Sequence, residues 1–74
     1  MQKLIDVPIR TRVRVAHVNT HPEMSVRLLE MGFCENAVIR CVNKGSGNIV
    51  YKISNSRIRL SAQVAGNSYV STVE

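Results

Sequence analysis

Short segments in which apolar and polar residues alternate occur five times along this chain, and they favour a sheet. The clearest is RTRVRVAHV, residues 10–18, where valines alternate with arginines. His17 continues the valine face but Val18 falls on the other face, so the alternation slips near Ala16, as a bulge would cause. A period of two places successive side chains on opposite faces of a strand. The other segments are residues 37–42, 49–54, 57–61 and 68–73. Five short strands joined by tight connections in 74 residues predict a mainly β fold, a small closed or nearly closed barrel.

One stretch, residues 20–31, breaks the alternation and is typical of a helix. Met24, Leu28 and Met31 are spaced i, i+4 and i+7, which puts them on one helical face. A helix of about three turns is marginal alone in water. We therefore expect one short α-helix between the first and second of the five strands, held by its leucines and closing the open side of the barrel.

The two ends of this helix have their own signals. Thr20 stands three residues before Glu23, which is the pattern of a capping box. Pro22 suits the first turn, where its missing N–H costs nothing. Gly32 is expected to end the helix in the left-handed conformation.

Leu28 and Leu29 are the first candidate binding residues. Adjacent helical residues point about 100° apart, so both leucines can be buried only if the helix is deeply covered. Either both belong to the core, or one of them lines a shallow apolar groove that receives a partner.

The basic residues are the second candidate. The chain has ten Lys and Arg against five Asp and Glu, a net charge of +5, and such a balance suits an anionic partner. Arg12, Arg14, Arg57 and Arg59 occupy outward positions of their strands. They form either a solvated face that discourages edge-to-edge aggregation or an electropositive face for an acidic protein or nucleic acid. Nucleic acid is disfavoured because no aromatic is placed as a stacking platform.

No set of residues predicts a metal site, a cofactor or catalysis. His17 and His21 do not share a helical face, and adding Cys34 or Cys41 gives no zinc-ligand spacing. No candidate nucleophile has a base placed beside it. We expect free, reduced thiols, no metal, no cofactor and no enzymatic activity. No apolar run reaches the roughly 18 residues of a membrane span, and no signal peptide is recognisable at the start; we expect a cytoplasmic protein that meets a membrane only through a partner.

These features together resemble one known family. The stretch RLLEMGF, followed by a strand, a glycine-containing loop, a strand, a tight turn and RIRLS, is similar to the ferrous-iron transport protein A (FeoA) family, and KLIDVP matches its opening. The resemblance runs from about residue 4 to residue 73. Arg10 stands where the family usually has glycine, Glu35 and Asn36 stand where it has Pro-Gly, and KGSGN replaces its Leu-Gly-Asp-Pro loop.

The resemblance implies one SH3-like barrel domain over residues 1–74 that is not an enzyme. It implies a small accessory or regulatory protein acting beside the ferrous-iron transporter FeoB, on the cytoplasmic side where that transporter carries a GTP-binding domain. Two alternatives stay open. One is an SH3-like module that binds another protein, as in the C-terminal part of metal-dependent repressors, and the other is a small basic nucleic-acid binder.

Overall fold

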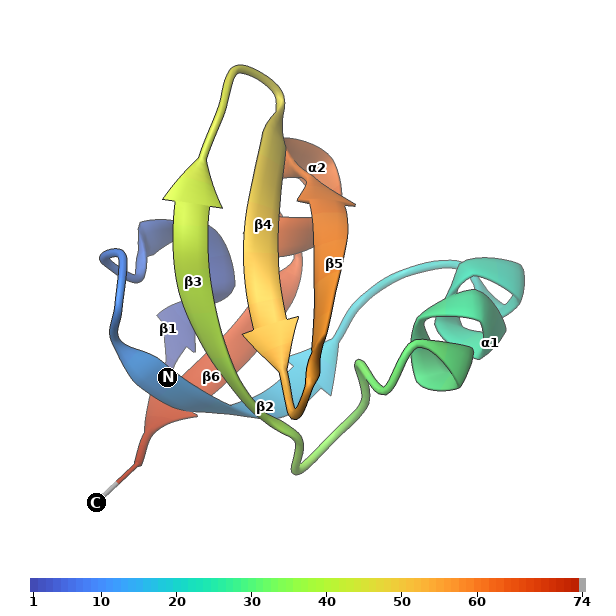
Figure 1. Ribbon diagram of the computed structural model, residues 1–74. Helices are drawn as coiled ribbons and strands as arrows, with labels where there is room; N and C mark the ends of the chain where they lie inside the picture. Colours follow the sequence, from blue (N-terminus) through green and yellow to red (C-terminus); the bar gives the residue numbers. More distant parts are fainter. Residues whose placement is uncertain (74) are drawn as a thin grey trace.

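A computed structural model describes residues 1–73 as one strongly curled antiparallel sheet with short helices at its margins (Figure 1). The strands are β1 (Gln2–Lys3), β2 (Arg12–Val18), β3 (Val38–Lys44), β4 (Asn48–Ile53), β5 (Ser56–Ser61) and β6 (Ser68–Thr72). They lie in the order β1-β6-β2-β3-β4-β5. A 3-10 turn, η1 (Leu4–Asp6), follows β1, and two helices, α1 (Pro22–Glu30) and α2 (Ala62–Gly66), follow β2 and β5.

The predicted mainly β, SH3-like fold is confirmed, with six strands where five were expected. The additional strand is β1, which pairs with β6 at two positions. Two residues next to a 3-10 turn carry no alternation that could have predicted a strand. The longer helix accordingly lies between β2 and β3, at the sequence position expected for it.

The core is built by the alternating residues. Val13 and Val15 of β2 are fully buried, and Tyr51 of β4 occupies the interior beside them in the same core cluster. Leu4, the first residue of η1, and Val7, which follows it, are equally buried. The aliphatic alternation therefore identified the inward face of the strands correctly.

The slip of the alternation that was expected near Ala16 is confirmed. A bulge at Ala16 shifts the register of β2 against β6, so that Val15 lies opposite Val70 but His17 lies opposite Tyr69. An extra residue in one strand exchanges the two faces beyond it. His17, expected on the valine face, is exposed, and Val18 packs against the core instead.

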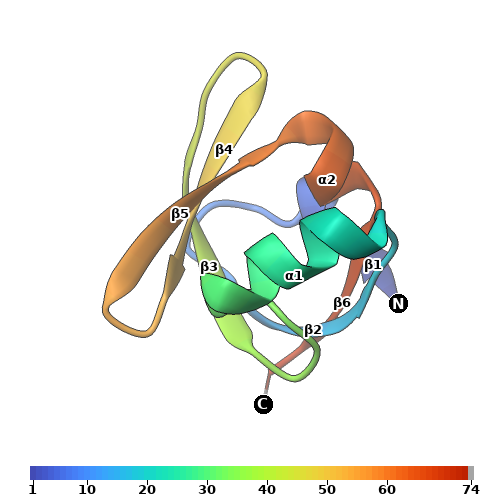
Figure 2. The same cartoon turned by 90° about the vertical axis from the view of Figure 1, so that its right-hand side faces the viewer.

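The open edges of the sheet are bridged by α2 and η1, not by α1 as expected. These two elements pack against each other, and α2 also contacts β5 and β6 (Figure 2). Helix α1 lies beyond one end of the barrel, as Figures 1 and 2 show from two directions. Within α1 only Leu28 is fully buried, and Met24 packs partly buried against the core, so the helix touches the barrel along a narrow strip and does not complete its wall.

Of the two predictions for the ends of α1, the one for the C-terminus is confirmed and the one for the N-terminus is wrong. The predicted capping box is absent: the N-cap is His21, in an extended conformation and without a side-chain cap. Pro22 at the first helical position explains this, because the residue before a proline is driven out of the helical region. Gly32 does end the helix as predicted, with φ +88°.

Candidate docking surface

The C-terminal end of α1 forms a Schellman motif, which places the side chains of Leu28 and Phe33 in the core. The N–H of Phe33 donates to the carbonyl of Leu28 (2.8 Å), and the N–H of Gly32 donates to the carbonyl of Leu29 (2.9 Å). In this motif the residue after the glycine meets the residue five positions earlier. Leu28 and Phe33 are both buried and together attach the helix to the barrel.

The same geometry leaves an apolar groove beside the attachment point. Its volume is about 220 Å³, and it is lined by five apolar or sulfur-containing side chains and two polar ones: Val18, Leu28, Leu29, Phe33, Cys34, Ser25 and Glu35. We call this the apolar groove. Its walls come from the end of β2 and from the α1 segment, and the 3.6-residue period of the helix decides which of the two lining leucines is buried and which is exposed at the edge.

The two candidate leucines therefore have different environments. Leu28 is 2% exposed and belongs to the core, whereas Leu29 is 58% exposed at the edge of the groove. Val26, three residues earlier, is 55% exposed. Residues three apart are neighbours on a helix surface, so Val26 and Leu29 form an apolar stripe that no other part of the described chain covers.

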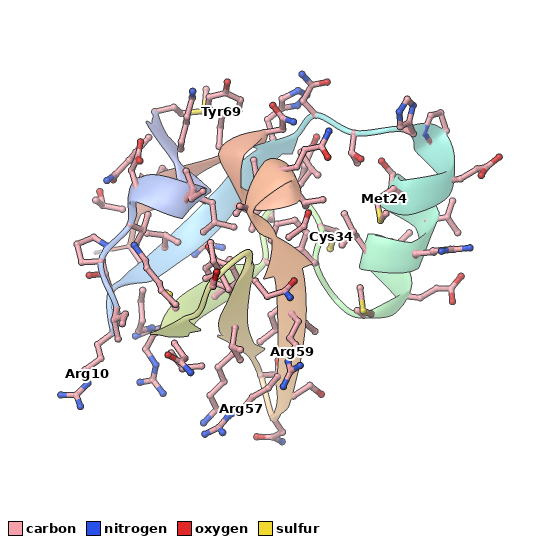
Figure 3. The ribbon with its side chains drawn as sticks, turned by 90° about the horizontal axis from the view of Figure 1, so that it is seen from above. Arg10, Met24, Cys34, Arg57, Arg59 and Tyr69 are labelled. Carbon is pink, nitrogen blue, oxygen red and sulfur yellow. The ribbon has the colours of Figure 1, made fainter. Side chains whose placement is uncertain are left out.

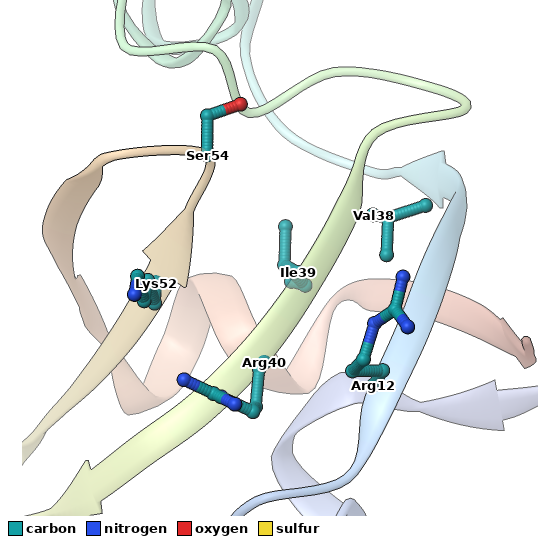
Figure 4. A pocket seen from close by; sticks show the side chains of 6 residues that line it. All are labelled: Arg12, Val38, Ile39, Arg40, Lys52 and Ser54. Carbon is teal, nitrogen blue, oxygen red and sulfur yellow. The ribbon is translucent and has the colours of Figure 1, made fainter.

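Four basic residues form a continuous row on the outer face of the sheet. Arg12 lies opposite Arg40, Arg40 opposite Lys52, and Lys52 opposite Arg57. We call these four residues the cationic row. Neighbouring strands are about 4.8 Å apart, so the row extends roughly 15 Å across four strands. Figure 4 shows Arg12, Arg40 and Lys52 around a shallow hollow of about 360 Å³.

The structure brings some of the predicted arginines together and separates others. Arg12 and Arg57 lie at the two ends of the cationic row. Arg59 lies one row further along, opposite Val50. Arg14 is turned away, since its Nη1 donates to the carbonyl oxygen of Asn36 at 2.9 Å.

The two central members of the row, Arg40 and Lys52, were missed as candidates. The signal was available in the sequence, because both stand at outward positions of alternating segments, AVIRCV and IVYKIS. What the sequence does not contain is the register that places them opposite each other.

The remaining titratable residues are dispersed. The rings of His17 and Tyr69 stack at 6.5 Å between centroids, and His21 is at the helix start. Cys34 lines the apolar groove and Cys41 lies in the core. Among residues 1–73 no three His, Cys, Asp or Glu side chains gather closely enough to hold a metal ion.

Two buried groups in the barrel interior have shifted ionisation. Desolvation raises the pKa of the Tyr51 phenol well above its usual range, and the neighbouring Cys41 thiol adds to the shift. Desolvation also raises the pKa of Cys41, against smaller opposing effects of Lys44 and of the Asn43 backbone. The Tyr51 hydroxyl is buried without a hydrogen-bond partner. Both groups are therefore held in their neutral forms, which suits a packed core and not an acid–base site.

Comparisons with known proteins agree with this architecture. A family model, the FeoA domain, matches residues 2–72. The FeoA protein from Chlorobium tepidum superposes with a TM-score of 0.92 at 17% identity, over 99% of this chain and 71% of that one. The iron(II) transport protein A from Clostridium thermocellum superposes with a TM-score of 0.87 at 27% identity, over 97% of this chain and 46% of that one.

The same fold occurs inside longer proteins. A manganese-dependent transcriptional repressor superposes with a TM-score of 0.87 at 17% identity, over 97% of this chain but only 41% of the repressor. A sequence comparison with curated proteins finds no match.

Proposed function

Because the chain belongs to the FeoA domain family, we infer that it is an accessory or regulatory protein of a bacterial ferrous-iron transport system. In this proposal it docks on the cytoplasmic side of the GTP-binding transporter FeoB and does no chemistry of its own. Family members are small non-catalytic proteins. Neither helix among residues 1–73 has the length and apolar composition of a membrane span.

The observation that carries this proposal is the exposure of Leu29 at the edge of the apolar groove. An exposed leucine beside an unfilled apolar depression is unfavourable in water, and it becomes favourable when a partner covers it. The neighbouring Val26 extends the apolar area along the helix. Interface energy is concentrated in a few residues that fill pockets, and a groove of about 220 Å³ can receive an apolar side chain of the transporter.

The attachment of α1 to the barrel makes the groove a preformed site. Leu28 and Phe33 fix the helix from below, and the backbone returns to β2 through the N–H of Asn36, which donates to the carbonyl of Val15 at 2.7 Å. A preformed site loses little entropy on binding. The helix needs no rearrangement to present Leu29.

The proposal is tested by binding of the full-length chain to the full-length transporter in nanodiscs of uncharged lipid, with and without guanine nucleotide. Leu29→Ser is expected to lower affinity at least about tenfold, as for an interface hot spot. The matched control is Leu29→Met, which keeps an apolar side chain at the same exposed position and is expected to bind nearly as well as the parent. Unchanged binding of Leu29→Ser, or an equal loss in both variants, would contradict docking through the groove.

A further inference from the structure

Basic and acidic residues are segregated within this molecule. Of the ten basic residues, β2, β3 and β5 carry two each and β4 carries one, while these four strands contain no acidic residue. Three of the five acidic residues, Glu23, Glu30 and Glu35, lie on α1 or just after it. The excess positive charge of the chain is therefore concentrated on the sheet.

Several of the basic side chains lie on one side of the barrel. Figure 3 places Arg10, Arg57 and Arg59 along one side of the molecule and Tyr69 on the opposite side. Directly opposed like charges destabilise a sheet, so a row of four basic residues reduces the stability of the free protein. An anionic surface lying against the row would remove that repulsion.

An exposed apolar turn stands beside the row. The N–H of Thr11 donates to the carbonyl of Pro8 (3.3 Å), and the N–H of Arg10 donates to the carbonyl of Cys41 (2.8 Å). These bonds hold the turn against β3, next to Arg40 and Arg12. Ile9 at the tip of this turn is 44% exposed.

We propose that this face, the cationic row with the Ile9 turn, binds the anionic headgroups of a lipid bilayer. Basic residues near an anionic leaflet each contribute to attraction, and an apolar side chain beside them can enter the boundary between headgroups and acyl chains. The inference does not depend on docking to the transporter, because α1, which carries Leu29, lies on a different side of the molecule from Arg10 and Arg57 (Figure 3). The two surfaces can be occupied together.

Other anionic partners fit this face less well. Single-stranded nucleic acid needs exposed aromatic side chains for stacking, but Tyr51 and Phe33 are buried and Tyr69 lies on the other side. A tightly bound protein needs large apolar or aromatic anchors. The side chains between the basic residues are half-buried valines, Val38 and Val50.

The test is co-sedimentation of the full-length chain with vesicles of phosphatidylglycerol and phosphatidylcholine in equal parts. We expect binding at low salt, loss of binding when salt reduces the screening length from ~10 Å to ~3 Å, and no binding to pure phosphatidylcholine. Removing one cation lowers partitioning about fivefold, so Arg40→Gln with Lys52→Gln is expected to lower it about 25-fold.

The matched control is Lys3→Gln with Arg27→Gln, which makes the same change in net charge at exposed positions outside this face. We expect the control to bind nearly as well as the parent chain. Arg12→Gln with Arg57→Gln, at the exposed ends of the row, repeats the test if the central variant folds poorly. Ile9→Ser is expected to weaken binding severalfold while keeping its salt dependence.

Three results would overturn the proposal. The first is an equal loss of vesicle binding in the row and control variants, which would mean that net charge alone acts. The second is equal binding to charged and uncharged vesicles. The third is tighter binding to a short DNA duplex or to polyglutamate than to vesicles at the same salt, which would assign the face to nucleic acid or to an acidic protein.

Discussion

Arg40 of β3 lies directly opposite Lys52 of β4, and Lys52 in turn lies opposite Arg57 of β5. Lys52 therefore has a positive charge on each side within the ladder. Opposed charges of unlike sign stabilise a strand pair by roughly 0.2–1 kcal/mol, and like charges destabilise it. We predict that Lys52→Glu raises the free energy of unfolding, because it converts two repulsions into two attractions.

Urea denaturation at low and high salt measures this effect. The gain should shrink as salt rises, since exposed charges are screened. Lys3→Glu, on β1 opposite Tyr69, makes the same charge change without basic neighbours in the ladder and should leave stability nearly unchanged. A Lys52→Glu protein that is no more stable than its parent at low salt would show that the row carries no repulsion.

Arg10 adopts φ +76° in the turn that precedes β2. A side chain in the left-handed region costs roughly 1–2 kcal/mol, and part of this is regained because glycine has more freedom in the unfolded chain. We predict that Arg10→Gly stabilises the protein by about 0.5–1 kcal/mol, measured by thermal denaturation. Asn36, at the same φ, should gain less from glycine because asparagine tolerates this region.

The positive φ at Arg10 and Asn36 is one feature of the fold that could be predicted from the sequence. Both positions were singled out because the resembling family has glycine at or beside them, and both do require the conformation that glycine adopts most easily. The inward faces of the strands followed from period-two alternation, which reflects only the geometry of a strand. These parts of the fold depend on local information.

The parts that could not be predicted depend on contacts between distant segments. The slip near Ala16 was visible as a break in the alternation, but the exchange of His17 and Val18 between the two faces depends on the pairing of β2 with β6. The closure of the sheet by α2 and η1 depends on packing between the two ends of the chain. The cationic row depends on the registers of three strand pairs, so its members are visible in the sequence but their alignment is not.

Leu28 and Leu29 should respond very differently to truncation. Leu28→Ala removes a buried side chain that attaches α1 to the barrel, and we predict a loss of about 2–5 kcal/mol in the free energy of unfolding. Leu29→Ala changes an exposed position and should alter stability by less than about 0.5 kcal/mol. Chemical denaturation of both variants checks this, and similar losses in the two would mean that Leu29 is covered in solution.

Gly32 should be intolerant of a side chain because of its backbone and not because of crowding. A Cβ at this position would meet Cγ2 of Ile53 at 3.5 Å, an ordinary contact, but φ is +88°. We predict that Gly32→Ala costs about 1–2 kcal/mol, whereas Gly32→Asn costs less because asparagine tolerates this conformation. Thermal denaturation of the pair measures the difference, and equal losses would point to steric contact as the cause.

Tyr51 and Cys41 should make the protein sensitive to alkali. Burial raises the pKa of both groups from ordinary values of 10.0 and 9.0, so the folded state favours their neutral forms. Above these ordinary values the unfolded chain binds fewer protons than the folded chain, and stability falls as pH rises. The stabilisation is complete below about pH 9 and is lost progressively as pH rises through the raised values of the folded state.

Tyr51→Phe separates the two contributions. The hydroxyl is buried without a hydrogen-bond partner, so its removal should leave stability at neutral pH unchanged or raise it by up to about 1–3 kcal/mol. Above pH 10 the variant should lose stability less steeply than the parent, because only the Cys41 thiol still resists ionisation. Urea denaturation from pH 7 to pH 11 measures both effects, and parallel pH profiles for the two proteins would mean that the Tyr51 hydroxyl does not control the alkaline transition.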